Sequence, residues 1–285
     1  MPPSTTPTAR RRRLGAELRK LRERAGITAT EAARLLGGNQ ARISNIEAGR
    51  YGVSAERVRT LSCHYHCPDE ALVNALAAMT GDRKRGWWEE YREILSAELL
   101  DLAELEHHGT ALRTAHVSGL PGLLQTTDHA REVFRQVVPA LTPPEIEHHL
   151  SFRIKRQAVI FREDPAPYRA VVHEAALHMR FGGAAVAGQQ LTHLLAMSER
   201  DHVTIRVIPF RAGGYPGTGQ PVHYVHGSVP QLDTVQLDQA HGMALLDAEA
   251  HLRKYRQVLD RMESLALDAA ESRDLVNAIA RSLST

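Results

Sequence analysis

Between residues 39 and 45 the chain carries amide, guanidinium and hydroxyl side chains, the types that hydrogen-bond to base edges and phosphates: Asn39, Gln40, Arg42, Ser44 and Asn45. An amide suits the edge of adenine, and a guanidinium suits guanine. Ile43 and Ile46 are three residues apart, so they turn to one side of a helix. The polar side chains and the small Ala41 then lie largely on the outer side. The pattern predicts a short helix with an apolar seam and a polar face.

The residues just before this helix predict a second one that holds it in place. Thr28 can cap the second helix, and Glu31 completes a capping box with it. Gly37 ends this helix, because positive φ has no steric cost in glycine. Ala33 is small, so the two helices can cross closely at a steep angle, as a helix-turn-helix requires. The alternative interpretation is an ordinary helical hairpin that binds no DNA.

The segment resembles the lambda-repressor-like (Xre/Cro) helix-turn-helix family. The matching residues are Thr28, Glu31, Ala33, Leu36, Gly37, Gln40, Ile43, Ser44, Ile46, Glu47 and Gly49. The resemblance implies that the helix with Gln40 and Ile43 lies in the major groove of DNA. It also implies a structural ion pair between Arg22 and Glu47. Two positions depart from the family: Ala32 replaces a large apolar residue, and Ala29 replaces a glutamine that commonly touches phosphate.

Basic residues flank the predicted recognition helix. Arg50 follows it in a loop, where its backbone N–H and its guanidinium are both expected to reach phosphate. Arg57 is expected to be exposed on the next helix, which Ser54 caps. The predicted DNA-binding residues are Thr28, Asn39, Gln40, Ala41, Arg42, Ser44, Asn45, Arg50 and Arg57.

Charge is unevenly distributed along the chain. Residues 1–67 hold 12 Arg and one Lys against five Glu, a net charge of +8, and the remaining residues carry −6. A basic end on an acidic body is typical of proteins that bind nucleic acid through one end. Residues 1–11 read as a disordered basic tail. The run from Arg10 to Arg13 either contacts phosphates or a minor groove, or simply begins a helix starting near Arg12.

Length and composition bound the class of protein. A chain of 285 residues, 43% hydrophobic and 24% charged, predicts a soluble protein of two domains. We expect no membrane segment and no signal peptide, and a cytoplasmic location. Cys63 and Cys67 make no disulfide framework. Soft ligands packed into five residues cannot readily surround a zinc ion, so we expect no metal there.

A helix-turn-helix domain is predicted over 12–80, a linker over 80–86, and a mixed α+β domain over 87–285. The paired tryptophans at 87 and 88 open a helix expected to reach about His107. Alternating apolar residues predict one small sheet, covered on one face and wetter on the other, with strands at 112–117, 169–173, 203–209, 222–225, 234–237 and 243–246. Helices are expected from Thr142, over 184–198, over 249–267 and after Asp268.

This second region resembles the domain of unknown function DUF5753, which follows the helix-turn-helix in many actinobacterial regulators. The matching segments are LPGLLQT at 120–126, RIKRQ at 153–157, VHEAAL at 172–177, QLTHL at 190–194, VTIRVIPF at 203–210 and GGYPG at 213–217. The resemblance implies a sensor or an antitoxin-type regulator of the WhiJ-like or Scr1-like kind. Such regulators are often encoded beside a very small partner protein.

Residues for enzyme chemistry are sparse. His173 and His178 flank Glu174 like a zinc-protease motif, but a five-residue step turns the second histidine about 140° round a helix. We therefore expect no enzyme, no catalytic residue, no metal and no cofactor; a hydrolase with a DNA-binding head is the enzyme alternative. A ligand or partner pocket is considered for Trp87, Trp88, His223, His226 and His241, although core packing is the ordinary role of paired tryptophans.

The two resemblances together imply a nucleoid-associated transcriptional regulator of the Xre type. We expect a homodimer on a palindromic operator in double-stranded DNA. An unidentified small-molecule effector or a small partner protein from a neighbouring gene would modulate it through the C-terminal domain. The alternative is an antitoxin-like adaptor, whose main role is to bind that partner.

Overall fold

The structure is a computed structural model that describes residues 7–80, 86–216, 219–239 and 242–283. The chain forms two compact units. The first comprises Met1–Arg92 and Ser96–Leu105, and the second comprises Glu93–Leu95 and Glu106–Thr285. The first unit is helical, and the second combines a six-stranded sheet with helices, which confirms the predicted fold class.

Helix α1 (Ala9–Arg24) begins before the predicted start at Arg12. The Thr8 hydroxyl caps it, accepting a hydrogen bond at 3.4 Å from the N–H three residues later. The expectation of disorder is therefore wrong for residues 9–11, which are helical, and the four arginines at 10–13 begin a helix rather than a free arm. Residues 1–6 of the predicted tail lie outside the described residues.

Helices α2 (Ala29–Leu35) and α3 (Gln40–Glu47) form the helix-turn-helix. Thr28 and Glu31 make the predicted capping box: the Thr28 hydroxyl accepts from the Glu31 N–H at 3.2 Å, and the Glu31 carboxylate accepts from the Thr28 N–H at 2.7 Å. The turn places Gly37 at a φ of +62°, a conformation that favours glycine. Two further helices, α4 (Ala55–His64) and α5 (Glu70–Ala78), complete the bundle.

A glycine in α1 allows that helix to lie directly against the end of α3. A Cβ atom added to Gly15 would be 2.4 Å from the carbonyl oxygen of Glu47 and 2.5 Å from that of Ile46. Gly49, at a φ of +72°, lies close to the first turn of α1, where an added Cβ atom would be 2.8 Å from the backbone nitrogen of Arg12. Because real Cβ atoms do not approach oxygen this closely, these glycines set the position of α3.

The segment after residue 86 differs from its prediction. Trp87–Tyr91 is a short 3-10 helix, and a separate helix, α6 (Ala97–His108), follows it. The single helix expected from the tryptophans to His107 is thus broken near residues 92–96. The predicted linker falls mainly on residues 81–85, which lie outside the described residues.

The second unit is built on a sheet with strand order β3-β2-β1-β4-β5-β6. The strands are β1 (Ala111–His116), β2 (Tyr168–His173), β3 (Val203–Ile208), β4 (Val222–His226), β5 (Thr234–Gln239) and β6 (Gly242–Leu246). The first three are parallel, joined by crossovers that contain helices, and the last three form an antiparallel meander. All six lie within two residues of their predicted positions.

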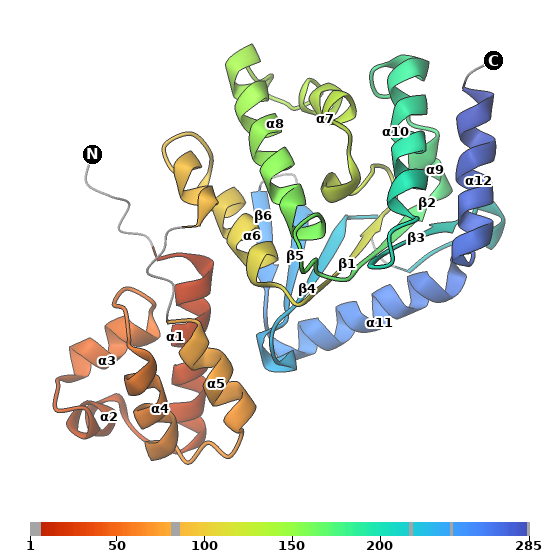
Figure 1. The fold of residues 1–285 in the computed structure, drawn as a ribbon. Helices are drawn as coiled ribbons and strands as arrows, with labels where there is room; N and C mark the ends of the chain where they lie inside the picture. Colours follow the sequence, from red (N-terminus) through yellow and green to blue (C-terminus); the bar gives the residue numbers. More distant parts are fainter. Residues whose placement is uncertain (1–6, 81–85, 217–218, 240–241, 284–285) are drawn as a thin grey trace. The chain divides into compact units, whose positions relative to one another are not determined.

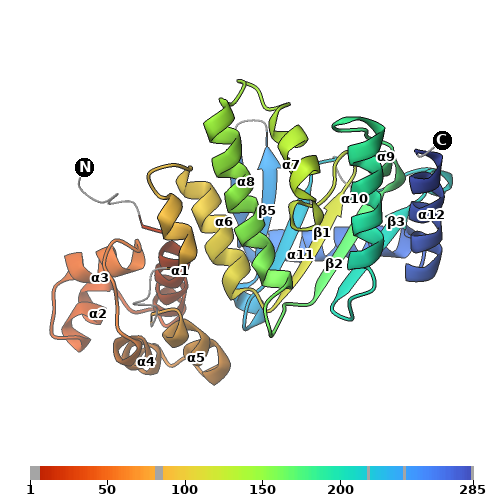
Figure 2. The same cartoon turned by 45° about the horizontal axis from the view of Figure 1, so that its top comes forward.

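Helices cover both faces of this sheet. They are α7 (Thr127–Phe134), α8 (Pro143–Gln157), α9 (Glu174–Leu177), α10 (Gly183–Met197), α11 (Glu249–Leu265) and α12 (Ala269–Ser282). Figure 1 shows α11 along one face and α8 and α10 over the other, and Figure 2 shows α8 crossing the same strands from a second side. The expected wetter face is therefore wrong for the central strands, because helical crossovers between parallel strands cover the sheet.

The two faces of the sheet differ in chemistry. Against α11 lies an apolar core that includes Val171, Tyr224, Leu252 and Met262. The face toward α8 carries polar residues at its centre, among them Thr114 and His223, which are paired across β1 and β4. Between α7 and α8 a smaller apolar cluster holds those helices together.

Candidate nucleic-acid interface

Helix α3 presents a polar face because its apolar residues are buried on the other side. Ile43 is 2% exposed and Ile46 is 3% exposed, and both belong to the core of the first unit. The outward residues are exposed, or half-buried in the case of Asn45: Gln40, Ala41, Arg42, Ser44 and Asn45. The structure thus contains the helix that the isoleucine spacing predicts, with its polar side chains at the surface.

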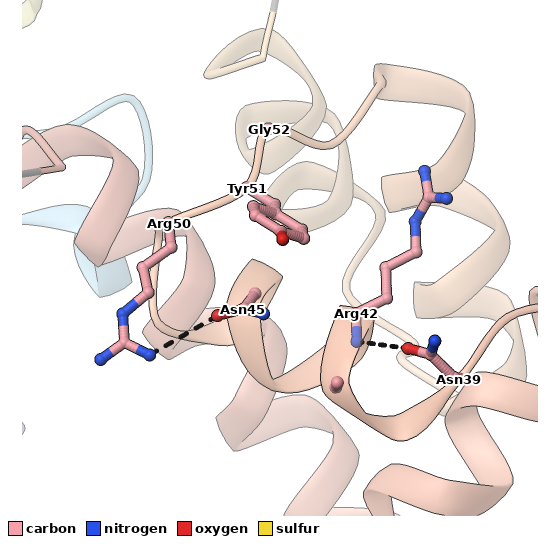
Figure 3. A pocket seen from close by; sticks show the side chains of 7 residues that line it. Asn39, Arg42, Asn45, Arg50, Tyr51 and Gly52 are labelled. Carbon is pink, nitrogen blue, oxygen red and sulfur yellow. Dashed lines mark hydrogen bonds between the residues drawn. The ribbon is translucent and has the colours of Figure 1, made fainter. Parts of the chain in front are cut away.

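A hollow lies beside this face, lined by Asn39, Ala41, Arg42, Asn45, Arg50, Tyr51 and Gly52. Figure 3 shows the Tyr51 ring between the guanidinium groups of Arg50 and Arg42 in this view. Arg50 Nη1 donates a weak hydrogen bond to Asn45 Oδ1 at 3.5 Å. An exposed aromatic ring between two cations suits the phosphates and sugars of a nucleic acid backbone.

Tyr51 is not among the residues that the sequence predicts to contact DNA. Its side chain is 56% exposed beside Arg42 and Arg50 in the same hollow. The sequence signal was present: Tyr51 lies between Arg50 and Gly52, directly after the loop that ends the recognition helix. Its contribution depends on the loop conformation, which spacing alone does not provide.

The backbone N–H of Arg50 does not have its predicted role. It donates to the carbonyl oxygen of Asn45 at 2.9 Å, and the Tyr51 N–H donates to the same oxygen at 3.1 Å. These bonds close the end of α3, where the last carbonyl groups lack helical partners. The guanidinium is therefore the group that Arg50 offers to a phosphate.

Two of the predicted DNA-contacting residues also start helices. The Thr28 hydroxyl is engaged with Glu31, at 2.7 Å from Oε2, and this interaction lowers the pKa of the Glu31 carboxyl. Asn39 Oδ1 accepts from the Arg42 N–H at 2.9 Å. Each residue keeps polar atoms at the surface. Their first effect is to orient the ends of α2 and α3.

Arg57 lies in the first turn of α4 with an exposed side chain. Its backbone N–H donates to the Ser54 hydroxyl at 3.3 Å, which is the predicted cap. The guanidinium is thereby held at the start of a helix and near the surface, which suits a phosphate contact rather than base reading.

The ion pair between Arg22 and Glu47 joins α1 to the end of α3. Arg22 Nε donates to Glu47 Oε1 at 2.6 Å, and Nη2 donates to Oε2 at 2.9 Å. Arg22 Nη1 also donates to the carbonyl oxygen of Ile27 at 2.8 Å. The hydrogen bond to Glu47 raises the pKa of Arg22 even though burial opposes it. Both side chains are about nine-tenths buried, so this bidentate pair fixes α3 without being available to DNA.

Family models match most of the chain in two parts. A helix-turn-helix domain model matches residues 13–76, and the model of the domain of unknown function DUF5753 matches residues 99–278. The chain belongs to the DUF5753 family. No curated protein and no solved structure matches it significantly. The helix-turn-helix supports a DNA-binding regulator of transcription.

Three of the DUF5753 segments quoted from the sequence, 120–126, 153–157 and 190–194, meet in space. Gln157 Nε2 donates to the carbonyl oxygen of Gln125 at 2.7 Å. Gln190 Nε2 donates to the carbonyl oxygen of Leu124 at 2.8 Å, and the Thr126 N–H donates to Gln190 Oε1 at 2.7 Å. Residues 120–126 are therefore anchored by glutamines from α8 and α10.

The predicted histidine pocket of this DUF5753 domain is wrong. His223 and His226 are three residues apart on β4, so they face opposite sides of the sheet. His223 lies 3.2 Å from Glu106, whereas His226 lies 3.5 Å from Asp233 beside Tyr224. His241 lies outside the described residues.

The two tryptophans of the predicted pocket lie in the 3-10 helix. Trp88 is 5% exposed, and its ring meets that of Trp87 edge to face at 5.9 Å between centroids. Tyr91 adds a second edge-to-face contact with Trp87, at 6.2 Å. This packing matches the ordinary core role of paired aromatic residues.

The protease-like residues have structural partners. His173 Nδ1 accepts from the Ala175 N–H at 3.2 Å and so caps α9, while Glu174 Oε2 accepts from the Phe210 N–H at 2.7 Å. Cys63 is an exposed thiol and Cys67 a half-buried one. In the described ranges no three residues among His, Cys, Asp and Glu are grouped to hold a metal ion. The described helices are each too short or too polar to traverse a bilayer.

Proposed function

We propose that this protein is a sequence-specific transcriptional regulator that inserts α3 into the major groove of double-stranded DNA. The observation that carries the proposal is the exposed polar face of α3, which is held outward by the buried Ile43 and Ile46 and bordered by Arg50. A helix of this kind fits the major groove, and its N-terminal residues meet the base edges.

Each polar group on this surface has a task that its chemistry suits. Arg42 would read guanine, and Gln40 and Asn45 would read adenine. Arg50 and Arg57 would neutralise phosphates, which makes affinity fall with salt concentration whatever the sequence. Phosphate contacts then set the position of the protein, and the side chains of α3 choose the site.

The proposed form is a homodimer of the Xre type on a palindromic operator. A single recognition helix contacts few base pairs, so two copies related by a two-fold axis would read half-sites about 34 Å apart. A cytoplasmic, nucleoid-associated protein without cofactor or enzyme activity fits this role. An effector or partner bound to the second unit would alter the affinity for DNA by differential binding to two states.

A second candidate function is an antitoxin-like adaptor that binds a small partner protein from a neighbouring gene. Apolar surface on the second unit favours it: Phe210 is 56% exposed and Met179 is 43% exposed. The Phe210 ring stacks on His178 at 6.0 Å between centroids, which keeps it in place at the surface. Co-purification of the full chain with the neighbouring gene product would support this function, and a chain that stays free of it would oppose it.

The regulator proposal is tested by selecting DNA sites with the purified full chain and measuring binding to the selected site. Arg42→Ala should weaken specific binding by about 1–3 kcal/mol and relax the preference at one base pair, whereas Arg50→Ala should weaken all sequences alike. Arg180→Ala removes the same charge from an exposed position in the second unit and serves as the matched control. If Arg42→Ala and Arg50→Ala both bind like the parent, α3 is not the recognition helix.

A further inference from the structure

The sheet face beneath α8 is polar at a depth where an apolar core is expected. Thr114, His223 and Gln236 lie directly opposite one another on β1, β4 and β5, and they are 3%, 7% and 5% exposed. The half-buried His116 and the exposed Asp238 follow two residues along their strands, on the same face. We call these five residues the polar floor. Burying polar groups is unfavourable unless they find hydrogen-bond partners.

Above the polar floor, the guanidinium of Arg156 is paired with a carboxylate. Arg156, on α8, donates to both oxygens of Glu106, at 2.8 Å from Nε and 2.6 Å from Nη2. His223 Nε2 lies 3.2 Å from Glu106 Oε1. Although burial opposes it, the charge of Arg156 lowers the pKa of Glu106 to about 2. The Glu106 carboxylate is thus committed to Arg156 and His223.

Arg153, one turn earlier on α8, makes no such hydrogen bonds to a carboxylate in the described part of the chain. Its Nη1 donates to the amide oxygen of Gln125, and its guanidinium lies 4.4 Å from the centre of the Phe134 ring. Its Nε is buried without a hydrogen-bond partner in the structure. Among the described residues no carboxylate accepts a hydrogen bond from Arg153; exposed Asp238 accepts one from Gln236 at 2.6 Å. Burial, and then Arg156, lower the pKa of Arg153 to about 9.

Two histidines near Arg153 add hydrogen-bonding groups, and the negative charges of Asp238 and Glu106 partly offset the effect of burial on the guanidinium. His129 is 2% exposed, and neither of its ring nitrogens has a hydrogen-bond partner within the described part of the chain. Burial, and then the charge of Arg153, lower the pKa of His129 to about 4. Burial, His223 and Arg153 lower that of His116 to about 3. These neutral imidazoles can each donate one hydrogen bond to an anion.

We propose that Arg153, with His129 and the polar floor beside it, binds a small ligand through a carboxylate or phosphate group. Two hydrogen bonds from a guanidinium match two oxygens of either anion, and a bound anion would supply an acceptor for the unpaired Nε. Gln125 is a positioning residue, because its amide oxygen holds Nη1 while Nε has no partner in the described part of the chain. Residues 120–126 and 153–157, which are far apart in the sequence, are brought together here to make this arrangement.

The inference rests on the proposed function in one respect, which is that the anion would be the effector of the regulator. The site lies within the second unit and contains no residue of α3, so its binding chemistry can be measured without DNA. A small anion suits a group placed between a helix and a sheet, whereas a protein surface could not reach it without displacing α8.

The test is titration of the full chain, by calorimetry and by thermal unfolding, with inorganic phosphate in one arm and succinate in the other. We expect one of the two anions to bind and to raise the unfolding temperature further as its concentration increases, with the logarithmic dependence of a single site. Arg153→Gln should lower the affinity for that anion by at least about tenfold, a change of roughly 1.4 kcal/mol. Arg180→Gln removes an exposed cation from the same unit and should leave binding unchanged.

Arg153→Lys keeps the charge and loses the two-pronged geometry, so it serves if Arg153→Gln does not fold, and it should also bind more weakly than the parent. The inference is overturned if neither anion binds the parent chain, or if the Arg153 variants bind as tightly as the parent. The DNA assay separates the two proposals. If the Arg153→Gln variant loses anion binding and still binds the operator, both the regulator proposal and the anion-site proposal are upheld. If the parent chain binds the anion and binds no operator, only the anion-site proposal is upheld.

Discussion

Arg22 and Glu47 show at the level of single residues how the recognition helix is held. Because both are about nine-tenths buried, removing one leaves the other as an uncompensated charge in a poor solvent. We expect Arg22→Ala to lower the free energy of unfolding by about 3 kcal/mol. Urea unfolding followed by circular dichroism measures this change.

Arg19→Ala is the control for that substitution. Arg19 also lies on α1 and pairs with Glu23 at 2.7 Å, but its side chain is 62% exposed. An exposed pair contributes little, so we expect a change of less than about 0.5 kcal/mol. Equal losses for Arg22→Ala and Arg19→Ala would contradict a structural role for the buried pair.

His129 predicts how stability depends on pH. Burial and the charge of Arg153 hold its pKa at about 4 in the folded protein, against an ordinary value of 6.5. Between these values the unfolded chain binds a proton that the folded chain does not, so acid favours unfolding. This contribution is complete above pH 6.5 and is lost as the pH falls toward 4.

We therefore expect the free energy of unfolding in urea to be lower at pH 5 than at pH 7. His129→Leu should reduce the difference, because leucine takes up no proton in either state. His116, whose pKa is held at about 3, adds a dependence of the same sign that the variant retains. A pH profile that is unchanged in His129→Leu would show that this ring titrates alike in both states.

At the scale of elements, the close contact between α1 and α3 depends on the absence of a side chain at Gly15. Gly15→Ala would place a Cβ atom 2.4 Å from the carbonyl oxygen of Glu47 and 2.5 Å from that of Ile46. Both atoms belong to the backbone, so neither can move aside as a flexible side chain could. The helices must then separate, so we expect a loss of stability of about 2 kcal/mol and weaker operator binding. Thermal unfolding and a DNA titration of the same variant measure the two effects.

Gly188→Ala is the matched control for helix glycines. Gly188 lies inside α10, and a Cβ there would meet nothing within 4 Å. Alanine favours a helix over glycine by about 0.5–1 kcal/mol, so this variant should be more stable than the parent. If Gly15→Ala stabilised the chain as well, the close approach of α1 to α3 would be absent in solution.

At the scale of the whole molecule, the proposed homodimer makes a geometric prediction about its operator. Two recognition helices would meet the same side of the duplex at half-sites about 10 base pairs apart. Inserting five base pairs between them turns one half-site to the far side, so affinity should fall toward that of a single half-site. Inserting ten should restore part of it. Gel-shift titrations with the three operators give the answer, and equal affinity for all of them would indicate a protein that binds as a monomer.

Local patterns in the sequence were sufficient for much of this structure. Caps such as Thr28 and Thr142, and the alternation of apolar residues in β3, predicted helix starts and strands because they act between residues near in sequence. The burial of Ile43 and Ile46 on one side of α3 is likewise set by residues near in sequence. The start of α1 was missed because Thr8 caps it ahead of a basic run that resembles a free arm.

The tertiary structure alone decided which distant residues meet. Strand spacing could not show that His223 and His226 have different surroundings, since that depends on which helix covers each face of β4. Nor could it show that Arg156 finds Glu106 while Arg153 finds an amide, because charge pairing across about 50 residues is set by packing. The sequence by itself determined a helix with an outward polar face and a mixed α and β body, since periodicity and capping are local. The unpaired Nε of Arg153 depends on how α8 packs on the sheet, so only the tertiary structure shows it.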